Sequence, residues 1–171
     1  FAKEYGAVAA PTAGRHFTQS LLEELNQNNI ERETITLHIG YGTFKPIQTE
    51  KIEDHKMHEE RYFLTEETAK RLTEAHRNKN IIAVGTTVIR TLESAFDGKE
   101  FRAGPGKTNL FITPKYSFRA INGLITNFHL PKSSLLILVS SFSSKNHILN
   151  AYNEAVKKQY RFFSFGDAML I

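Results

Sequence analysis

The stretch 124–134, which reads LITNFHLPKSS, constrains the fold more than any other part of the chain. It begins as an apolar run, then places Asn127 and His129 in close succession before Pro131 stops it. The pattern predicts a strand that carries an amide and an imidazole to its carboxyl end. Open α/β sheets hold their ligands at that end of the strands. A structural interpretation is equally open, in which Asn127 forms a turn and His129 binds a backbone carbonyl.

Helical and extended patterns alternate along the rest of the chain, which predicts a single α/β domain over residues 1–171. We expect a mainly parallel or mixed sheet, and Asn122-Gly123 is typical of a hairpin turn. Ser20, Thr65 and either Ser133 or Ser134 are the expected helix caps. The predicted strands are 33–39, 60–64, 81–84, 110–112, 118–121 and a strand from 124, and the predicted helices follow Ser20, Thr65 and Gly85, with another at 146–159.

Composition narrows the classes of function. The chain has 171 residues, no cysteine and a formal net charge of +4. Without cysteine, neither a disulfide framework nor a thiolate metal site is possible. No apolar run approaches the length of a membrane span, so we expect no membrane partner. The mild positive charge permits an anionic partner such as a phosphate-bearing ligand or RNA without requiring one.

The junction at Gly85 is the second informative feature. A short apolar run leads through Gly85 into Thr86 and Thr87 at the start of a helix, where free backbone N–H groups favour an anion. Arg90 and Glu93 fall on one face of that helix, at a spacing that allows them to pair. Arg90 can bind a carboxylate or phosphate there. The alternative is a capped helix with a surface ion pair.

Other positions carry weaker signals. Arg15-His16 follows a tight loop before a helix, with a simple helix start as the alternative. The spacing of His55 and His58 suits one helical face, but no third ligand is evident, so we expect no metal. The aromatic tail at 160–165 favours core packing over stacking on nucleobases.

Several segments resemble, in order, the S-adenosylmethionine:tRNA ribosyltransferase-isomerase family of queuosine biosynthesis. The resemblance covers most of the chain and rests on residues 7–18, 38–46, 57–59, 82–94, 124–136 and 160–171. It implies transfer and isomerisation of the ribosyl group of S-adenosylmethionine onto 7-aminomethyl-7-deazaguanine in tRNA. The expected product is epoxyqueuosine, with adenine and methionine released, no metal used, and a cytoplasmic location.

The resemblance also implies an architecture. Family members have a three-layer α/β/α sandwich with an inserted β-barrel domain. This chain resembles only the carboxyl-terminal portion, so the barrel and the start of the α/β domain would belong to a missing amino-terminal part. Two positions depart from the family pattern: Asn109 replaces a usual Asp, and Lys115 replaces a usual Gly. A charge is therefore absent at position 109.

Site roles follow from the same resemblance. His129 is the first choice and His16 the second for the base that removes the acidic C5′ proton of the sulfonium-bearing ribose. Arg90, with the amides of Thr86 and Thr87, is expected to hold the methionine carboxylate. Phe128 or Phe17 is expected to stack on adenine, and Asn127 to orient a ribose hydroxyl or the adenine edge. Glu93 is expected to fix Arg90 or to face the sulfonium. Thr12 and Arg15 are expected to bind substrate.

These roles require Arg90 and His129 to meet around one nucleoside-sized pocket. One rival interpretation is a non-catalytic tRNA-binding fragment of the same enzyme. Another is a phosphate-ester or nucleotide hydrolase at the Gly85 junction, which the absence of a Walker lysine and of a carboxylate cluster disfavours.

Overall fold

The computed structural model describes residues 10–40, 47–49 and 51–171. Positions 7–9 and 41–46, which belong to segments that carry the family resemblance, lie outside these ranges. The α-helices are α1 (Gln19–Gln27), α2 (Glu66–Asn78), α3 (Thr86–Ala95), α4 (Ser134–Phe142) and α5 (Lys145–Lys157). The strands are β1 (Thr36–His38), β2 (Glu60–Leu64), β3 (Ile82–Val84), β4 (Gly104–Thr108), β5 (Gly123–Asn127) and β6 (Ala168–Leu170). Short 3-10 helices occur at η1 (Ala13–His16), η3 (Ile52–Asp54) and η4 (Phe163–Phe165).

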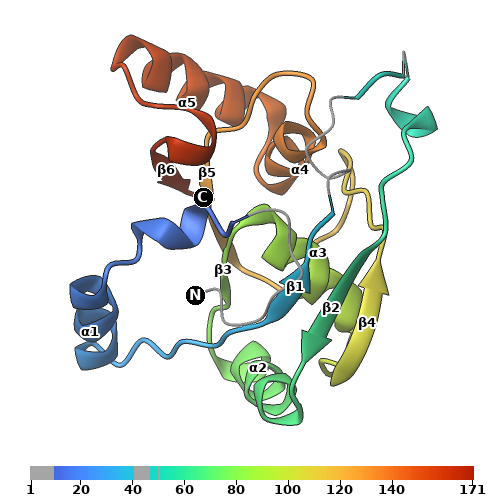
Figure 1. The fold of residues 1–171 in the computed structure, drawn as a ribbon, viewed down its shortest axis with the longest axis vertical. Helices are drawn as coiled ribbons and strands as arrows, with labels where there is room; N and C mark the ends of the chain where they lie inside the picture. Colours follow the sequence, from blue (N-terminus) through green and yellow to red (C-terminus); the bar gives the residue numbers. More distant parts are fainter. Residues whose placement is uncertain (1–9, 41–46, 50) are drawn as a thin grey trace.

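The strands form two sheets (Figure 1). One has the order β1-β2-β4 and is antiparallel, with Tyr62 opposite Gly106. The other has the order β3-β5-β6, in which β3 and β5 are parallel and β6 runs antiparallel to β5. In the second sheet, Ala83 lies opposite Leu124, and Asn127 lies opposite Ala168. The α/β prediction is confirmed, and of the two sheet types predicted the mixed one is found.

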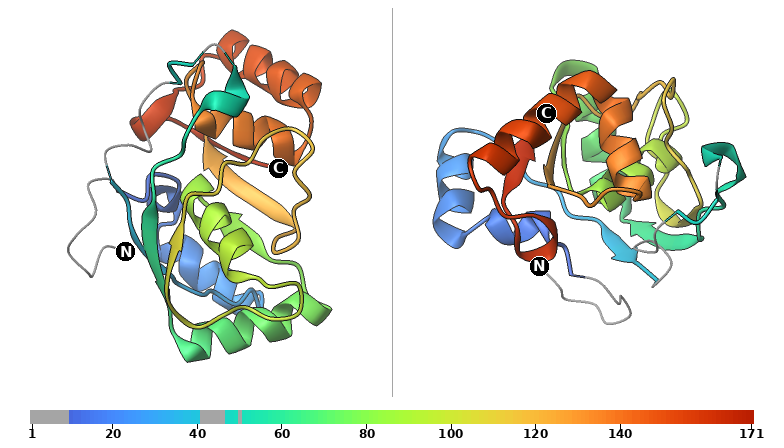
Figure 2. Two further views of the ribbon diagram at one scale, coloured as in Figure 1. Left: turned by 90° about the vertical axis from the view of Figure 1, so that its right-hand side faces the viewer. Right: turned by 90° about the horizontal axis from the view of Figure 1, so that it is seen from above.

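Helix α3 packs between the two sheets, with contacts to β3, β4 and β5. Its apolar side chains Ile89 and Leu92 are buried in the core, together with Leu64 of β2 and Leu124 of β5. Helices α4 and α5 contact each other and lie at one end of the molecule, while α2 lies at the other (Figures 1 and 2). The carboxyl end of β5 is therefore next to α4, α5 and the tail.

Several predicted elements are confirmed. Strand β2 has the expected bounds, and the Thr65 hydroxyl caps α2 by accepting a hydrogen bond from the Thr68 backbone N–H. Ser133 is the residue that caps α4, through the Leu136 N–H. The predicted helix at 146–159 is found as α5, which begins one residue earlier because the Ser144 hydroxyl caps it.

Other predictions were wrong. Residues 110–112 and 118–121 are not strands, and the glycine-rich segment 104–108, where no strand was predicted, forms β4. Asn122-Gly123 makes no hairpin turn, because the Asn122 side-chain oxygen accepts the Ile81 N–H and β5 pairs parallel to β3. Thr18, not Ser20, caps α1. The apolar run 81–84 is typical of a strand buried on both faces, but Ile82 of β3 is 46% exposed.

Candidate functional site

The site is organised by Asn127, the last residue of β5. Its side chain is buried, and the amide nitrogen donates to the carbonyl of Gly166 at 3.0 Å and to that of Asp167 at 3.3 Å. These bonds hold the tail against the end of β5, beside β6. The amide oxygen Oδ1 is buried and has no hydrogen-bond partner among the described residues. A buried acceptor without a partner costs stability, and an N–H or O–H donor from a ligand would satisfy it. Arg90 Nη2 and the Thr91 hydroxyl are likewise buried without a partner in the described part of the chain.

His16 meets the same carbonyl from the other side. It ends η1, is exposed, and its ring nitrogen Nε2 lies 3.1 Å from the Gly166 oxygen and 3.3 Å from the Asn127 Nδ2. Because a carbonyl can only accept, Nε2 carries the hydrogen in the neutral ring. The Asn127 amide then shares the same acceptor. Nδ1 is left as the nitrogen with a free lone pair, which suits a base.

His129 occupies a different environment. Its ring is buried, with Nε2 2.9 Å from the Thr126 hydroxyl, and its backbone N–H donates to the Tyr152 hydroxyl at 2.8 Å. Burial lowers the pKa of His129 from 6.5 to about 4. The same burial raises the pKa of Tyr152 to about 12. A base with so low a pKa is weak, so His129 is poorly suited to the role of the base for which it was the first choice.

The expected stacking residues are also placed differently. Phe128 lies in the core, with Tyr152, Tyr160 and Phe162 packed around its ring at centroid distances of 5.1–5.9 Å. A ring in that position is covered by protein, and stacking on adenine does not fit it. Phe17 follows η1 and is half-buried, so part of its ring is open.

At the α3 corner the polar groups face inward. Gly85 has a φ of +103°, which favours glycine, and its N–H donates to the Ile125 carbonyl. Arg90 is 1% exposed, and its Nη1 pairs with the Glu60 Oε2 of β2 at 2.8 Å. Its Nε donates to the Leu110 carbonyl at 2.9 Å. Burial lowers the pKa of Arg90, and Glu60 opposes this. Arg90 therefore holds β2 to the 110 segment, and the expected pair with Glu93 is not formed.

Glu93 accepts hydrogen bonds from the segment that precedes β5. Its carboxylate accepts the backbone N–H groups of Arg119 and Ala120, at 3.1 and 2.9 Å, and the Tyr116 hydroxyl at 3.0 Å. Burial and the neighbouring Glu93 carboxylate raise the pKa of Tyr116 to about 12. Glu93 thus fixes the segment before β5 and does not contact Arg90, which corrects the expectation that it would.

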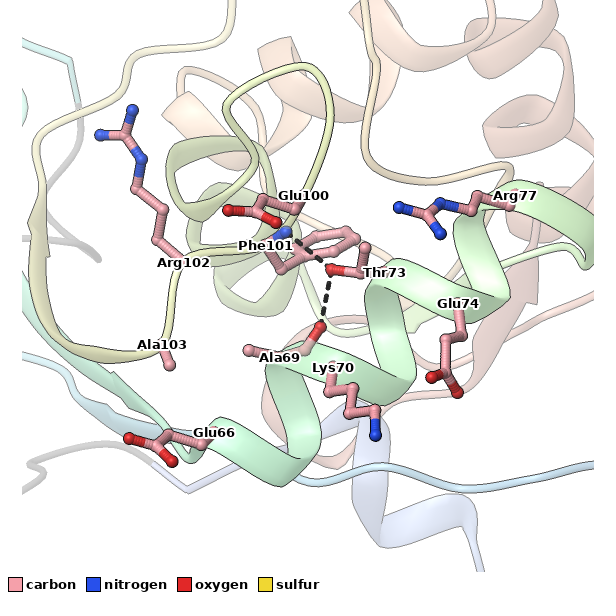
Figure 3. Close-up of a pocket in the computed structure, with 10 residues that line it drawn as sticks. All are labelled: Glu66, Ala69, Lys70, Thr73, Glu74, Arg77, Glu100, Phe101, Arg102 and Ala103. Atoms are coloured by element: carbon pink, nitrogen blue, oxygen red, sulfur yellow. Dashed lines mark hydrogen bonds between the residues drawn. The ribbon is translucent and has the colours of Figure 1, made fainter.

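Arg90 and His129 have separate partners, Glu60 of β2 in one case and the Tyr152 hydroxyl of α5 in the other, and neither residue lines the two pockets described below. Figure 3 shows a pocket of about 560 Å³ elsewhere, between α2 and the 100–103 segment. In it the Thr73 hydroxyl accepts the Phe101 N–H and donates to the Ala69 carbonyl. A second pocket, of about 420 Å³, lies beside Arg32 and Arg71. No predicted site residue lines either pocket.

The other predicted residues cluster at the two corners. Thr12 is half-buried and its carbonyl accepts the Arg15 N–H at the start of η1. Thr86 is buried and Thr87 half-buried in the first turn of α3. Sequence reasoning missed Gly166, whose carbonyl joins His16 to Asn127. The Gly166-Asp167 turn after the aromatic tail was the available signal. The prediction that the aromatic tail packs in the core is wrong at Phe165, which is 81% exposed.

Within the described ranges, no three His, Asp or Glu side chains gather as they would around a metal ion. The ring of His55 packs against Phe111 at a centroid distance of 5.1 Å. No helix in the described part of the chain is both long and apolar enough to span a bilayer.

Comparison with known proteins supports the family resemblance seen in the sequence. A sequence model of the family described as queuosine biosynthesis protein matches residues 1–171. A relative from Thermotoga petrophila is 54% identical over 172 residues, and one from Staphylococcus haemolyticus is 57% identical over 173 residues. Both are named S-adenosylmethionine:tRNA ribosyltransferase-isomerase, and each alignment covers 100% of this chain and 51% of the relative.

A solved structure is similar as well. The crystal structure of S-adenosylmethionine tRNA ribosyltransferase from Thermotoga maritima matches with a TM-score of 0.77 at 44% identity. The match covers 93% of this chain and 51% of that one. The chain therefore spans about half the length of the relatives it matches.

Proposed function

Because the chain belongs to the queuosine biosynthesis protein family, we propose that it is the carboxyl-terminal portion of an S-adenosylmethionine:tRNA ribosyltransferase-isomerase. The support is its identity of 54–57% to relatives of that name across its whole length. Since it spans 51% of those relatives, the proposal assigns catalysis to this chain together with an amino-terminal part.

The proposed reaction uses S-adenosylmethionine as the ribosyl donor. The ribosyl group is transferred to the aminomethyl group of 7-aminomethyl-7-deazaguanine in tRNA and isomerised to give epoxyqueuosine, with adenine and methionine released. A cytoplasmic location belongs to the same proposal, because the proposed substrate is tRNA.

The observation that carries the site assignment is the unpaired, buried Asn127 Oδ1 beside the exposed His16. We assign Asn127 Oδ1 to accept a hydrogen bond from a ribose hydroxyl or from the adenine amino group. We assign His16 Nδ1 to take the C5′ proton, which the adjacent sulfonium acidifies. His16 replaces His129 as first choice because a base works best with a pKa near the working pH, and burial holds that of His129 at about 4.

The remaining proposed binding residues flank these two. Thr12, Arg15 and Phe17 lie in or beside η1, on the same side of Asn127 as His16. Thr87, half-buried at the first turn of α3, keeps its proposed role with the amides of that turn. Arg90 loses its proposed role because its guanidinium is enclosed and paired with Glu60.

A turnover assay tests the assignment of His16. This chain is joined to the amino-terminal half of the Staphylococcus haemolyticus relative, and adenine release from S-adenosylmethionine is measured with tRNA. We expect His16→Ala to lower kcat by roughly 10²–10⁴, the contribution of a general base, with S-adenosylmethionine affinity retained. His147→Ala is the matched control, because His147 is an exposed histidine at the start of α5. Near-normal turnover in His16→Ala would remove His16 as the base.

The second candidate function is a tRNA-binding fragment that performs no chemistry alone. The share of the relatives that the chain spans, 51%, favours it. The chain without any added half would then bind tRNA with a strong dependence on salt, as phosphate contacts release counterions. Calorimetric titration would show no heat with S-adenosylmethionine. Consumption of S-adenosylmethionine by the isolated chain would exclude this candidate.

A further inference from the structure

The tail presents an aromatic ring to solvent. Phe165 in η4 is 81% exposed, more than any other large hydrophobic side chain among the described residues. The guanidinium carbon of Arg15 lies 5.5 Å from the centre of its ring, within the range of a cation–π contact. Among the described residues, no acidic side chain pairs with Arg15.

The loop that carries Phe165 is closed and strained. The Arg161 N–H donates to Asp167 Oδ2 at 2.7 Å, the Asp167 N–H donates to the Arg161 carbonyl at 2.8 Å, and the two side chains form an ion pair. A Cβ at Gly166 would lie 2.5 Å from the Arg161 oxygen, so only glycine fits there. Phe163 has a φ of +70°, rare for a bulky residue, and its N–H is held by the Phe128 carbonyl.

Strained backbone of this kind persists only where the surrounding structure enforces it, and it gathers at ligand-binding sites. The hydrogen bonds and the ion pair of this loop therefore fix the Phe165 ring in its exposed position. A ring positioned before binding loses little conformational freedom when a ligand stacks on it.

The ring also lies next to the candidate site. Phe165 directly precedes Gly166, whose carbonyl binds both His16 and Asn127. Arg15 directly precedes His16. Adjacent residues have Cα atoms about 3.8 Å apart, so the contact between Phe165 and Arg15 lies one residue along each segment from the contact between Gly166 and His16. Neither of the two pockets is lined by Phe165, and its surface is open.

We propose that Phe165 and Arg15 form a platform on which an unpaired base of RNA stacks, next to the nucleotide that reacts at His16. The inference rests on the proposed function, because it takes the RNA to be the tRNA substrate. An open aromatic surface with an unpaired cation is how proteins bind single-stranded RNA, with the base on the ring and a phosphate on the cation. A small nucleoside such as S-adenosylmethionine needs an enclosing cavity instead.

Fluorescence anisotropy with two RNAs tests the platform. The chain is titrated with a labelled stem–loop that has an unpaired loop and with a fully paired duplex. We expect Phe165→Ala to weaken stem–loop binding roughly 5- to 100-fold, the loss of one stacked base, and to leave duplex binding unchanged. Phe165→Trp should retain stem–loop affinity because it keeps an aromatic face.

Two further variants separate stacking from general effects. Phe63→Ala is the matched control, since Phe63 is an exposed phenylalanine, 45% accessible, on β2 of the other sheet. It should bind both RNAs as the parent chain does. Arg15→Ala should weaken binding of the stem–loop and reduce the slope of log affinity against log salt by about 1, as expected for one lost phosphate contact. Circular dichroism of each variant confirms that it is folded.

The results that overturn the platform are distinct from those that overturn the proposed function. The platform is wrong if the chain binds no RNA, or if Phe165→Ala binds the stem–loop as tightly as the parent. It is also wrong if Phe165→Ala lowers only S-adenosylmethionine affinity, measured by calorimetry, or only the stability of the chain joined to its amino-terminal half. If Phe165-dependent RNA binding is found but the joined protein does not consume S-adenosylmethionine, the platform stands and the proposed function fails.

Discussion

The α3 corner and the β5 corner use similar polar side chains in opposite ways. At α3, Arg90 pairs with Glu60, and the carboxylate of Glu93 accepts two backbone N–H groups and a tyrosine hydroxyl. At β5, the Asn127 amide is bonded on one side only, and His16 is exposed. The first corner directs most of its polar groups at neighbouring segments, with Arg90 Nη2 left without a partner among the described residues, while the second leaves an acceptor and an exposed imidazole.

The difference shows how to separate structural from functional polar residues in this fold. Charged side chains that are enclosed and fully directed at the protein fix the approach of one segment to another. Groups that are fixed by one bond but retain an open or unpaired atom are prepared for a ligand. By this criterion Glu93 stabilises the domain, and His16 and Asn127 form the candidate site. Arg90 bonds to Glu60 and to the Leu110 carbonyl but, like Asn127, keeps one buried atom without a partner among the described residues, its Nη2.

The largest expected effect tests the structural role of the α3 corner. Replacing Glu60 with Ala leaves the Arg90 guanidinium buried without its carboxylate, so we expect a loss of about 3–5 kcal/mol in the free energy of unfolding. Urea denaturation followed by circular dichroism measures it. Glu59→Ala is the matched control, because the exposed pair of Glu59 with Lys107 contributes about 0–1 kcal/mol. Equal effects of the two substitutions would contradict the comparison.

The next effect is the dependence of stability on pH that the buried His129 produces. His129 has a pKa of about 4 in the folded chain and 6.5 when unfolded, so the unfolded state takes up the proton first as the pH falls. Stability is therefore lost below pH 6.5 and the loss levels off below pH 4, amounting to about 3 kcal/mol. His129→Gln should remove this part of the pH dependence, measured by urea denaturation from pH 7 to 4. An unchanged slope in that variant would show that His129 is not held neutral.

The smallest expected effect concerns the segment that Glu93 fixes. Lys115 has a φ of +83° and directly precedes Tyr116, whose hydroxyl donates to Glu93. The left-handed region suits glycine, the residue usual in the resembling family. Lys115→Gly should therefore raise the melting temperature slightly, corresponding to about 0.5–1 kcal/mol. A lower melting temperature would mean that the lysine side chain makes a stabilising contact that outweighs the strain.

Much of the fold could be predicted because local signals agreed with it. Strand β2 alternates buried and exposed side chains, and α2 begins at a threonine cap with acidic residues in its first turn. Both patterns depend on nearby residues alone. The stretch 124–134 likewise forms a strand that leads to a capped, apolar helix, as predicted.

Strand β4 could not be predicted from its own residues because its sequence is explained by packing against a side chain of another strand, β2. Its glycine and proline residues disfavour a strand by propensity. Gly106, however, lies under the ring of Tyr62, and any Cβ there would collide with that ring. Pro105 is tolerated because β4 is an edge strand. The packing of β2 therefore selects residues that local reasoning assigns to a loop.

The candidate site was predicted only in part, because the contacts between its residues join segments that are distant in sequence. Asn127 and His16 were named from their own segments, but the Gly166 carbonyl that joins them lies 150 positions from His16. Helical spacing predicted a pair between Arg90 and Glu93. In the structure both side chains bind partners distant in sequence: Arg90 pairs with Glu60, and Glu93 accepts the backbone N–H groups at 119–120. Periodicity along one helix carries no information about such partners.

The most direct test of the central claim compares both corners in one experiment. Nitrogen-15 spectra of the histidine rings and the arginine Nε–H groups are recorded on the chain joined to an amino-terminal half, before and after addition of S-adenosylmethionine. The assignment of the site to the β5 corner predicts that the ring signals of His16 shift while the Arg90 Nε–H signal stays in place. A shift at Arg90 with His16 unchanged would contradict it.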